Sequence, residues 1–330
     1  MQKISIIGAG AWGTALAMLC NRAGREVTLW GRSAGLVEEM RQRTMNNRYL
    51  PGIYLDPSIR LTNDIAEACQ TELLIVSVPA QHMRSTIIGI TDHLAASVPI
   101  VIASKGIERG SLALMSEIVK AVLPVNPVAM LSGPNFAGEA ANGIPTATTI
   151  ACKDKRLGED IMRSIGSTLF RPYLSTDVIG TQIGGATKNV IAIACGIAYG
   201  KKMGENTRAA LITRGLAEIA RLCLAKGGKY ETLMGLAGIG DLVLTCSSTQ
   251  SRNFSLGMQL ADGKDRSTTL AGRAGIVEGA STAQSVTELS RKLGVEMPIC
   301  QAVSDILYKD SNVDDTIRQL LDRPFTREIT

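Results

Sequence analysis

Two lysines in apolar surroundings are the strongest candidates for proton transfer. Lys188 lies in GGATKNVIA, residues 184–192, among small and apolar residues of a predicted buried helix. Lys105 lies in ASKGI, residues 103–107, after a predicted strand, at the carboxyl end where open α/β sheets bind ligands. Burial or a nearby second ammonium group lowers the pKa of a lysine toward neutrality, where it can exchange protons. From the residues alone, a surface lysine with a buried stem is an equal alternative for Lys188.

A carboxylate and a polar loop could complete such a site. Asp241 stands between glycines and an apolar run in GIGDLVLT, residues 238–245, where it needs a partner such as a lysine. If this run is helical, Thr245 shares a face with Asp241. Gln250, Ser251, Arg252 and Asn253 follow in the chain, and a guanidinium beside an amide suits a phosphate group. Each segment alone could be an ordinary loop or cap, but together they predict a cleft for a phosphorylated ketone.

A glycine-rich turn near the start of the chain predicts a dinucleotide site. Gly8, Gly10 and Gly13 form GxGxxG directly after a predicted strand and at the start of a predicted helix. The first glycine permits a tight turn, the second lets the backbone approach a pyrophosphate, and the third lets helix pack on strand. Free N–H groups at the helix N-terminus then bind the phosphates. A glycine-rich turn without a ligand is the alternative.

The residues after the second predicted strand bear on the choice of dinucleotide. An NAD site usually has Asp or Glu there to accept hydrogen bonds from the ribose 2′-OH, but this chain has Arg32 and Ser33. Arg32 can pair with a 2′-phosphate, and Ser33 can add a donor. NADP(H) is therefore favoured over NAD(H), which stays open. The alternative for Arg32 is a solvated surface side chain.

The elements that must position these residues divide the chain into two parts. The first part alternates predicted strands (3–8, 26–30, 73–78, 99–103 and 128–131) with predicted helices (11–23 and 34–43). Continuous apolar strands separated by helices indicate a parallel sheet covered on both faces. Beyond residue 177 only helices are predicted, at 182–199, 207–226, 282–293 and 298–308. We therefore expect an α/β Rossmann-type dinucleotide-binding domain over 1–178, a mainly α-helical substrate-binding domain over 179–330, and a ligand between them.

Composition excludes several classes of protein. The 330 residues are 45% hydrophobic and 20% charged, which fits a two-domain globular chain and not a disordered one. The net charge of +5 comes without a basic block, so no nucleic-acid partner is expected. Neither a signal peptide nor a membrane-spanning stretch is recognisable, so we expect a cytoplasmic protein without stable membrane insertion. Seven scattered cysteines and the two histidines, His82 and His93, predict buried thiols and no metal site.

Eight motifs, in order along nearly the whole chain, resemble those of bacterial NAD(P)-dependent sn-glycerol-3-phosphate dehydrogenases. They are GAGAWGTA at 8–15, ASKGIE at 103–108, SGPNFAGE at 132–139, GGATKNVIAI at 184–193, LITRGLAE at 211–218, GIGDLVLTC at 238–246, QSRN at 250–253 and VEG at 277–279. The GGATKNV segment and the pairing of GDLVLTC with SRN are far more specific than GxGxxG. The resemblance implies the Rossmann-type and helical domains expected above.

The resemblance also implies roles for individual residues. Lys188 matches the proton-transfer lysine, Lys105 a lysine that contacts substrate and nicotinamide, and Asp241 the carboxylate near the reacting end of the substrate. The expected substrate-binding set is completed by Gly133, Asn135, Asn189, Thr245, Ser251, Arg252 and Asn253. The expected cofactor-binding set is Gly8, Gly10, Ala11, Trp12, Gly13, Arg32, Ser33, Lys105, Ala137, Arg252, Ile276 and Glu278. The family often has Ser at the place of Ala11 and Val at that of Ile276, differences that should be mild.

The resemblance implies reversible reduction of dihydroxyacetone phosphate to sn-glycerol 3-phosphate, which supplies glycerophospholipid synthesis in the bacterial cytosol. We expect a homodimer, because the apolar helical half permits one. Two rival interpretations stay open. One is a related two-domain dehydrogenase, such as a 6-phosphogluconate or ketopantoate reductase-like enzyme, against which Lys188, Asp241 and Arg252 argue together. The other is a redox-sensing dinucleotide binder without turnover, which has no use for a lysine in the second domain.

Overall fold

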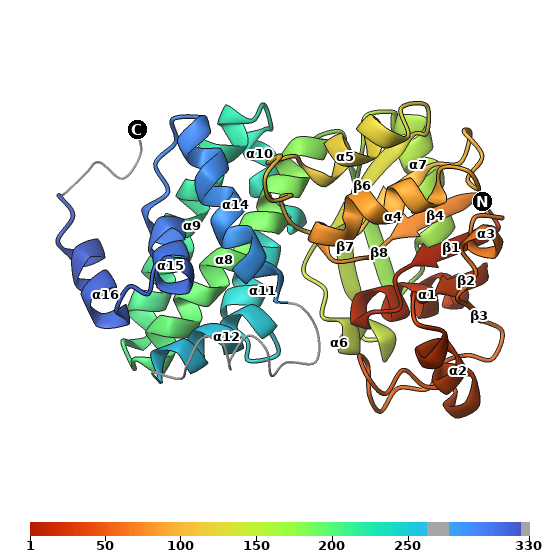
Figure 1. Cartoon of the computed structure of the whole chain (residues 1–330), viewed down its shortest axis with the longest axis horizontal. Helices are drawn as coiled ribbons and strands as arrows, with labels where there is room; N and C mark the ends of the chain where they lie inside the picture. The colour runs from red at the N-terminus through yellow and green to blue at the C-terminus, as the bar shows by residue number, and fades with distance from the viewer. Residues whose placement is uncertain (263–276, 325–330) are drawn as a thin grey trace.

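The computed structural model describes residues 1–262 and 277–324. Figure 1 shows two bodies side by side, one built on a sheet and one made of helices. The sheet has the strand order β3-β2-β1-β4-β5-β6-β7-β8. Its strands are β1 (Lys3–Ile7), β2 (Glu26–Trp30), β3 (Arg60–Thr62), β4 (Leu73–Val76), β5 (Ile100–Ile102), β6 (Val128–Ser132), β7 (Thr146–Cys152) and β8 (Phe170–Ser175).

Helices cover both faces of the sheet, as the continuous apolar strands predict. The helices of this body are α1 (Ala11–Arg22), α2 (Ala34–Arg43), α3 (Ile65–Ala68), α4 (Met83–Ile90), α5 (Met115–Val122), α6 (Ala137–Ala141) and α7 (Lys155–Ile165), with a 3-10 turn, η1 (Ala80–His82). Alternate residues of one strand enter opposite layers: Leu73 and Ile75 pack with α1 and α7, whereas Leu74 and Val76 pack with α4 and α5. The Rossmann-type α/β prediction is therefore confirmed.

The predicted parallel sheet is confirmed for the predicted strands, and the structure adds an antiparallel neighbour at one edge that was not predicted. The strands from β3 to β6 are parallel, but β7 pairs antiparallel with β6, and β8 is parallel to β7. After β6 the chain turns back through α6, which packs against α1, and re-enters the sheet from the end at which β6 left it. An antiparallel neighbour does not need the long crossover that a parallel one requires.

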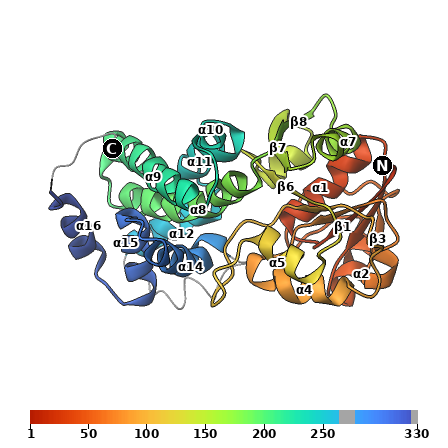
Figure 2. The same ribbon diagram turned by 90° about the horizontal axis from the view of Figure 1, so that it is seen from above.

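The second body is entirely helical over the described residues, as predicted. Its helices are α8 (Val178–Gly200), α9 (Gly204–Ala225), α10 (Tyr230–Leu233), α11 (Asp241–Cys246), α12 (Arg252–Ala261), α14 (Glu278–Lys292), α15 (Pro298–Tyr308) and α16 (Val313–Leu321), with a π-helical turn, η2 (Leu236–Gly240). Helix α8 runs through the middle of this body, where α9, α11, α12, α14 and α15 contact it (Figure 2). It is buried almost all round, which its apolar sequence explains.

Helix α8 begins four residues earlier than the apolar pattern predicts. Asp177 is its N-cap, and one carboxylate oxygen accepts a hydrogen bond from Gly180 N at 2.9 Å. The other oxygen accepts from Lys229 N at 2.8 Å and from Thr232 Oγ1 at 2.7 Å. This carboxylate therefore joins the start of α8 to the segment between α9 and α10.

All seven cysteines are buried and free, as predicted.

Candidate active site

The side chains of Lys188 and Asp241 meet in the interior of the helical body. Lys188 lies on α8 with 8% of its side chain exposed, and Asp241 is the first residue of α11 with 1% exposed. The Lys188 ammonium group donates to Asp241 Oδ1 and, at 2.7 Å, to Thr245 Oγ1. The surface-lysine alternative for Lys188 is therefore wrong. The expectation that Asp241 and Thr245 share a helix face is confirmed, because α11 is helical through both.

Lys105 reaches the same carboxylate from the sheet body. It follows β5, and its Nζ donates to Asp241 Oδ2 at 2.7 Å and to the Gly133 carbonyl oxygen at 3.3 Å. One buried carboxylate thus binds two ammonium groups that come from different bodies of the protein. The predicted lysine partner of Asp241 is confirmed, and there are two of them.

The electrostatics favour proton exchange by Lys188. The pKa of Lys188 is lowered to about 8: burial is the main cause, the positive charge of Lys105 adds to it, and the Asp241 carboxylate acts in the opposite direction. A lysine whose pKa lies near neutrality is populated in both protonation states at working pH and suits general acid–base catalysis.

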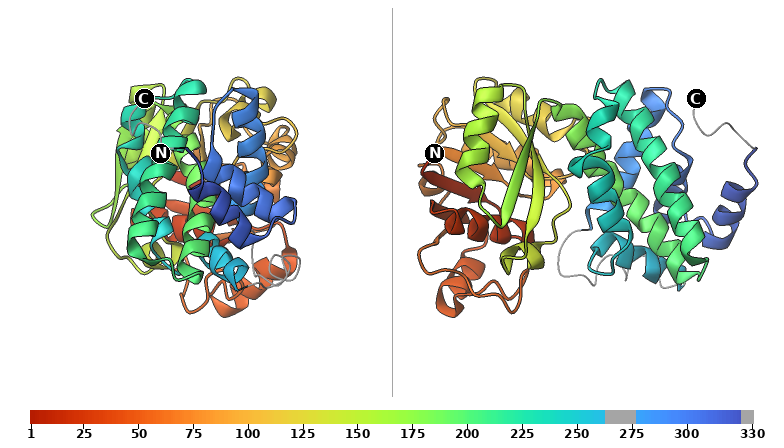
Figure 3. Two further views of the ribbon diagram at one scale, coloured as in Figure 1. Left: turned by 90° about the vertical axis from the view of Figure 1, so that its left-hand side faces the viewer. Right: turned by 180° about the vertical axis from the view of Figure 1, so that it is seen from behind.

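Glycines let Asp241 approach α8 closely. The π-helical turn η2 precedes α11, and within it a Cβ at Gly238 would lie 2.1 Å from the Leu233 carbonyl oxygen. On α8, a Cβ at Gly184 would lie 2.6 Å from the Ala237 carbonyl oxygen. In the right-hand view of Figure 3, the teal segment that contains η2 and α11 lies on the side of the helical body that faces the sheet. The backbone is kinked at Gly238, where φ is −110° and ψ is −105°.

A second polar cluster joins three helices beside this centre. Ser251 is the N-cap of α12, and its Oγ accepts a hydrogen bond from Phe254 N at 3.2 Å. Asn253 Nδ2 donates to Asn189 Oδ1 at 3.0 Å, and Asn253 Oδ1 accepts from Gly279 N at 2.9 Å. Arg252 is the first residue of α12. A helix N-terminus with a guanidinium group beside it suits an anion such as a phosphate.

The SGPN segment after β6 faces Lys105. Gly133 is required there because a Cβ would lie 2.9 Å from Thr148 Cα. Asn135 Nδ2 donates to Thr146 Oγ1 at 2.6 Å and to the Ala147 carbonyl oxygen at 2.9 Å. Its Oδ1 is buried and has no partner among the described residues. Ala137 begins α6.

The glycine-rich turn fits a dinucleotide phosphate. Gly8 has φ +117°, and a Cβ at Gly13 would lie 1.8 Å from the Gly8 carbonyl oxygen. Gly10 is the N-cap of α1 without any side-chain cap, and nothing lies within 4 Å of a Cβ built on it. Ala11 and Trp12 form the partly buried first turn of α1. The free N–H groups of this turn can therefore receive a pyrophosphate.

Substitutions at Gly10 and Gly13 should have different effects, one on cofactor affinity and the other on stability. Gly10→Val should keep the fold, since its side chain enters open space, but should raise the Kd for NADPH by about 10-fold or more by blocking the backbone approach. Gly13→Ala should lower the melting temperature, because its Cβ collides with the Gly8 carbonyl. NADPH fluorescence titration and thermal unfolding of both variants measure this. Unchanged affinity in Gly10→Val would remove the turn from the cofactor site.

Three further expected cofactor contacts lie near this turn or on α14. Ser33 is the N-cap of α2, with its Oγ accepting from Leu36 N at 3.3 Å, and Arg32 beside it is exposed. Glu278 Oε1 accepts from Ala80 N at 3.2 Å, whereas its Oε2 is buried without a partner among the described residues. Burial raises the pKa of Glu278 to about 7, against the opposing effect of Arg252. Ile276 lies outside the described residues.

Comparison with known proteins agrees with this geometry. Residues 3–158 match the family described as NAD-dependent glycerol-3-phosphate dehydrogenase N-terminus, and residues 177–318 match its C-terminus. The chain is 49% identical over 327 residues to the NAD(P)+ glycerol-3-phosphate dehydrogenase of Parvibaculum lavamentivorans, covering 99% of this chain and 98% of that one. It is 48% identical to the enzyme of Maricaulis maris over the same shares. The chain belongs to the NAD(P)-dependent glycerol-3-phosphate dehydrogenase family.

A crystal structure of glycerol-3-phosphate dehydrogenase from Coxiella burnetii has the same fold. It superposes with a TM-score of 0.94 at 38% identity and covers 97% of this chain and 98% of that one. Membership of the family confirms the resemblance drawn from the motifs and makes the protein an NAD(P)-dependent oxidoreductase of glycerol 3-phosphate. It decides against the two rival interpretations.

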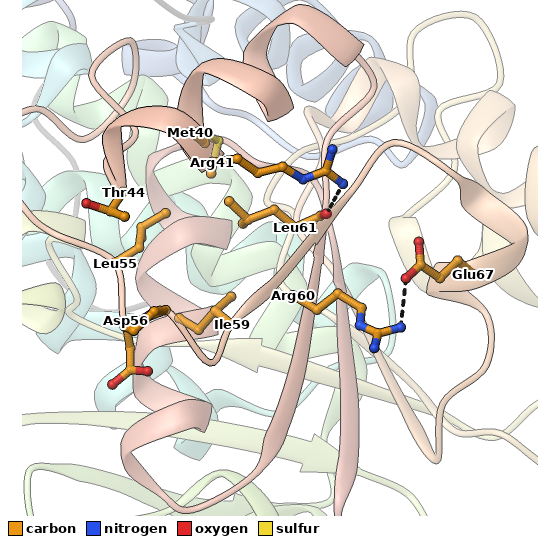
Figure 4. Close-up of a pocket in the computed structure, with 10 residues that line it drawn as sticks. Met40, Arg41, Thr44, Leu55, Asp56, Ile59, Arg60, Leu61 and Glu67 are labelled. Carbon is orange, nitrogen blue, oxygen red and sulfur yellow. Dashed lines mark hydrogen bonds and ion pairs between the residues drawn. The ribbon is translucent and has the colours of Figure 1, made fainter.

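The pocket drawn in Figure 4 is not this dehydrogenase site. It has a volume of about 440 Å³ and lies between α2, the 55–59 loop, β3 and α3, at the edge of the sheet. Its arginines already have protein partners: Arg41 donates to the Leu61 carbonyl oxygen, and Arg60 pairs with Glu67 at 3.0 Å. Neither lysine of the site lines it.

Sequence reasoning missed a residue that supports the dinucleotide turn of this dehydrogenase. Asn46 is fully buried, and its Nδ2 donates to the Ala9 carbonyl oxygen at 3.0 Å and to Thr14 Oγ1 at 2.8 Å. The asparagine stands in the polar stretch Thr44–Arg48, where nothing in the sequence separates a buried amide from a solvated one.

Over the described residues, no helix is long and apolar enough to cross a membrane, and no three acidic, histidine or cysteine side chains gather as a metal site.

Proposed function

We propose that the enzyme reduces dihydroxyacetone phosphate with NADPH, and that Lys188 exchanges the proton with the substrate oxygen. The observation that carries this proposal is the Asp241 carboxylate held between the ammonium groups of Lys188 and Lys105. In this proposal the two positive groups, one of them with a pKa of about 8, stabilise the negative charge that the carbonyl oxygen gains during reduction. When bound, the nicotinamide supplies the hydride.

Each residue of the centre has a distinct role in this proposal. Lys188 donates its proton to the carbonyl oxygen during reduction and takes it back from the hydroxyl group during oxidation. Asp241 and Thr245 orient the Lys188 ammonium group through their hydrogen bonds to it. Lys105 stabilises negative charge on the substrate oxygen from the other side.

The N-terminus of α12 holds the phosphate of the substrate in this proposal. Ser251, Arg252 and Asn253 stand on its first turn, and Asn189 reaches the same cluster from α8, one residue after Lys188. The phosphate cluster and the proton donor are therefore tied to one helix. Gly133 and Asn135 border the opposite side, and the buried, unpaired Oδ1 of Asn135 can accept a hydrogen bond from a substrate hydroxyl group.

The cofactor residues fit a dinucleotide, and we propose NADPH as the preferred one. Gly8, Gly10 and Gly13 with the first turn of α1 receive the pyrophosphate, and Ala137, Arg252 and Glu278 complete the site. Arg32 is exposed at the end of β2, where a guanidinium group can pair with a 2′-phosphate. The Kd values of the native enzyme and of the Arg32→Ala variant for NADPH and NADH test whether the enzyme prefers NADPH or binds both cofactors alike.

Further features of the proposal follow from the chain as a whole. The sheet ends with β8 at Ser175 and α8 begins at Val178, which supports a division into domains 1–178 and 179–330. We place the enzyme in the cytoplasm as a homodimer that supplies glycerol 3-phosphate for glycerophospholipid synthesis. Size-exclusion chromatography with light scattering tests the dimer.

The Arg252→Ala variant tests the phosphate site. Removing the guanidinium group should raise the KM for dihydroxyacetone phosphate by about 10–100-fold, because a charge-assisted hydrogen bond contributes roughly 1.5–3 kcal/mol. Loss of NADPH absorbance with dihydroxyacetone phosphate measures this, and dihydroxyacetone without the phosphate is the control substrate, whose kcat/KM should change much less. An unchanged KM would exclude Arg252 from the phosphate site, and no turnover by the native enzyme would exclude the proposed function.

A further inference from the structure

Helix α5 starts with an incomplete cap of its own. It begins at Met115 after Leu114, whose apolar side chain cannot accept a hydrogen bond from the first turn. The first N–H groups of a helix have no partner within the helix and need one from elsewhere. This matters for the active site, because the loop from β5 to α5 carries Lys105.

The missing acceptor comes from the other body of the protein. Gln182, on the second turn of α8 and only 3% exposed, accepts a hydrogen bond from Ser116 N through Oε1 at 2.9 Å. Its Nε2 donates to Ser116 Oγ at 2.8 Å and to the Val178 carbonyl oxygen at 3.0 Å. Every hydrogen-bonding atom of this amide is therefore engaged, and two of its bonds cross between the bodies.

Other contacts hold the same loop to the helical body. Ser285 Oγ on α14 donates to the Ile107 carbonyl oxygen at 3.0 Å, and Lys226 pairs with Glu117 at 2.8 Å. On the side of the sheet body, Gln81 Nε2 donates to the same Ile107 oxygen at 2.9 Å. The loop is thus anchored to the second body at Ile107, and the first turn of α5 that follows it is anchored at Glu117. Lys105 lies at the start of the loop.

We propose that Gln182 is a positioning residue for catalysis: by capping α5 from α8, it holds the β5–α5 loop, and with it Lys105, in register with Asp241. The proposal rests on the function proposed above, because it concerns the placement of Lys105. Gln182 and Lys188 share the rigid helix α8, so a single helix sets the position of the proton donor and that of the loop opposite it. In this proposal Gln182 acts through the loop and not by contact with the substrate or cofactor.

The Gln182→Met variant tests this proposal, since it keeps the length of the side chain and removes every hydrogen bond. A displaced Lys105 should lower kcat for dihydroxyacetone phosphate by about 10–100-fold, as a misplacement of 1 Å can cost on the order of 10²-fold. The pH at which kcat/KM for reduction is half-lost should also rise, because Lys105 helps to lower the pKa of Lys188. The Kd for NADPH should change much less than kcat, because Lys105 is only one of the expected cofactor contacts.

Three controls separate positioning from general damage. Gln301→Met removes an amide that bonds only within α15, to Asp305 at 2.8 Å, and should leave kcat and the pH profile unchanged. Ser116→Ala removes one of the bonds across the bodies and should shift the profile in the same direction by less. In the cofactor-free protein, hydrogen exchange at residues 115–118 should be faster in Gln182→Met than in the native chain.

A double variant decides the outcome. If Gln182 acts through Lys105, the pH profile of Lys105→Met/Gln182→Met should shift no further than that of Lys105→Met. A lower melting temperature in Gln182→Met with an unmoved pH profile would overturn the proposal and leave a structural role only. If Lys105→Met itself changes neither kcat nor the pH profile, Lys105 has no role in the proposed function. The inference about Gln182, which depends on that role, is then excluded as well.

Discussion

The Lys188→Ala variant is expected to lose about 10²–10⁴-fold in kcat while it binds NADPH as the native enzyme does, because it lacks the general acid that protonates the carbonyl oxygen. The substituted side chain lies on α8 inside the helical body, whereas the dinucleotide turn lies at the start of α1. Stopped-flow hydride transfer and NADPH titration measure the two quantities separately. A variant that keeps more than a tenth of native turnover would refute the assignment.

The pH dependence of the native enzyme gives an independent check on Lys188. Reduction needs the protonated amine, so kcat/KM, which reports the free enzyme, should be constant below the pKa of about 8 and fall above it. Oxidation of glycerol 3-phosphate needs the neutral amine, so its kcat/KM should rise through the same pH. Both dependences should vanish in Lys188→Ala. Lys201→Ala, which removes a lysine at the end of α8 that pairs with Asp314, is the matched control and should change neither.

Much of the fold could be predicted because apolar periodicity marks long, buried elements. The predicted ranges of β2 and α2 agree with the structure at every residue, and that of α1 differs by one. The missed strands are of other kinds. β3 has only three residues, and β8 (FRPYLS) contains Arg and Pro, which interrupt an apolar pattern. β7 (TATTIAC) was missed although its Thr and Ile residues favour a strand. The antiparallel direction of β7 is set by tertiary packing.

The site was predictable where chemistry and local sequence coincide. Lys188 and Asp241 stood out because charged residues in apolar segments need partners, and the structure pairs them. Residues that act through backbone contacts gave no such indication. Gln182 looks like any polar residue at the start of a helix, and only the structure shows that its amide caps α5 in the other body. Contacts of this kind depend on how two domains meet, which no local pattern records.

The Asp241→Asn variant should damage both catalysis and stability, because the Asp241 carboxylate pairs with both lysines of the centre. The amide keeps the size of the side chain but removes the carboxylate that pairs, among the residues the structure describes, with the ammonium groups of both Lys188 and Lys105. The pKa of Lys188 should fall below about 8, since burial and Lys105 continue to lower it while the opposing carboxylate is lost. The decline of kcat/KM for reduction should then begin at a lower pH, the direction opposite to that expected for Gln182→Met. The maximal kcat should also fall by about 10²-fold or more, as Lys188 loses its orientation.

Stability should fall in the same variant, because a buried charge that loses its partner costs about 3–5 kcal/mol. The sign of its pH dependence follows from Lys188. A lysine whose pKa in the folded state lies below its unfolded value disfavours folding as the pH falls, so the deficit should be larger at pH 6 than at pH 9. Urea unfolding at both pH values measures it. Asp314→Asn is the control. The side chain of Asp314 is 55% exposed and pairs with Lys201, so its loss should change stability by at most about 1 kcal/mol at either pH. An equal loss of unfolding free energy in Asp241→Asn at the two pH values would show that Lys188 stays charged without its carboxylate. Asp241 would then not be the group that sets the pKa of Lys188.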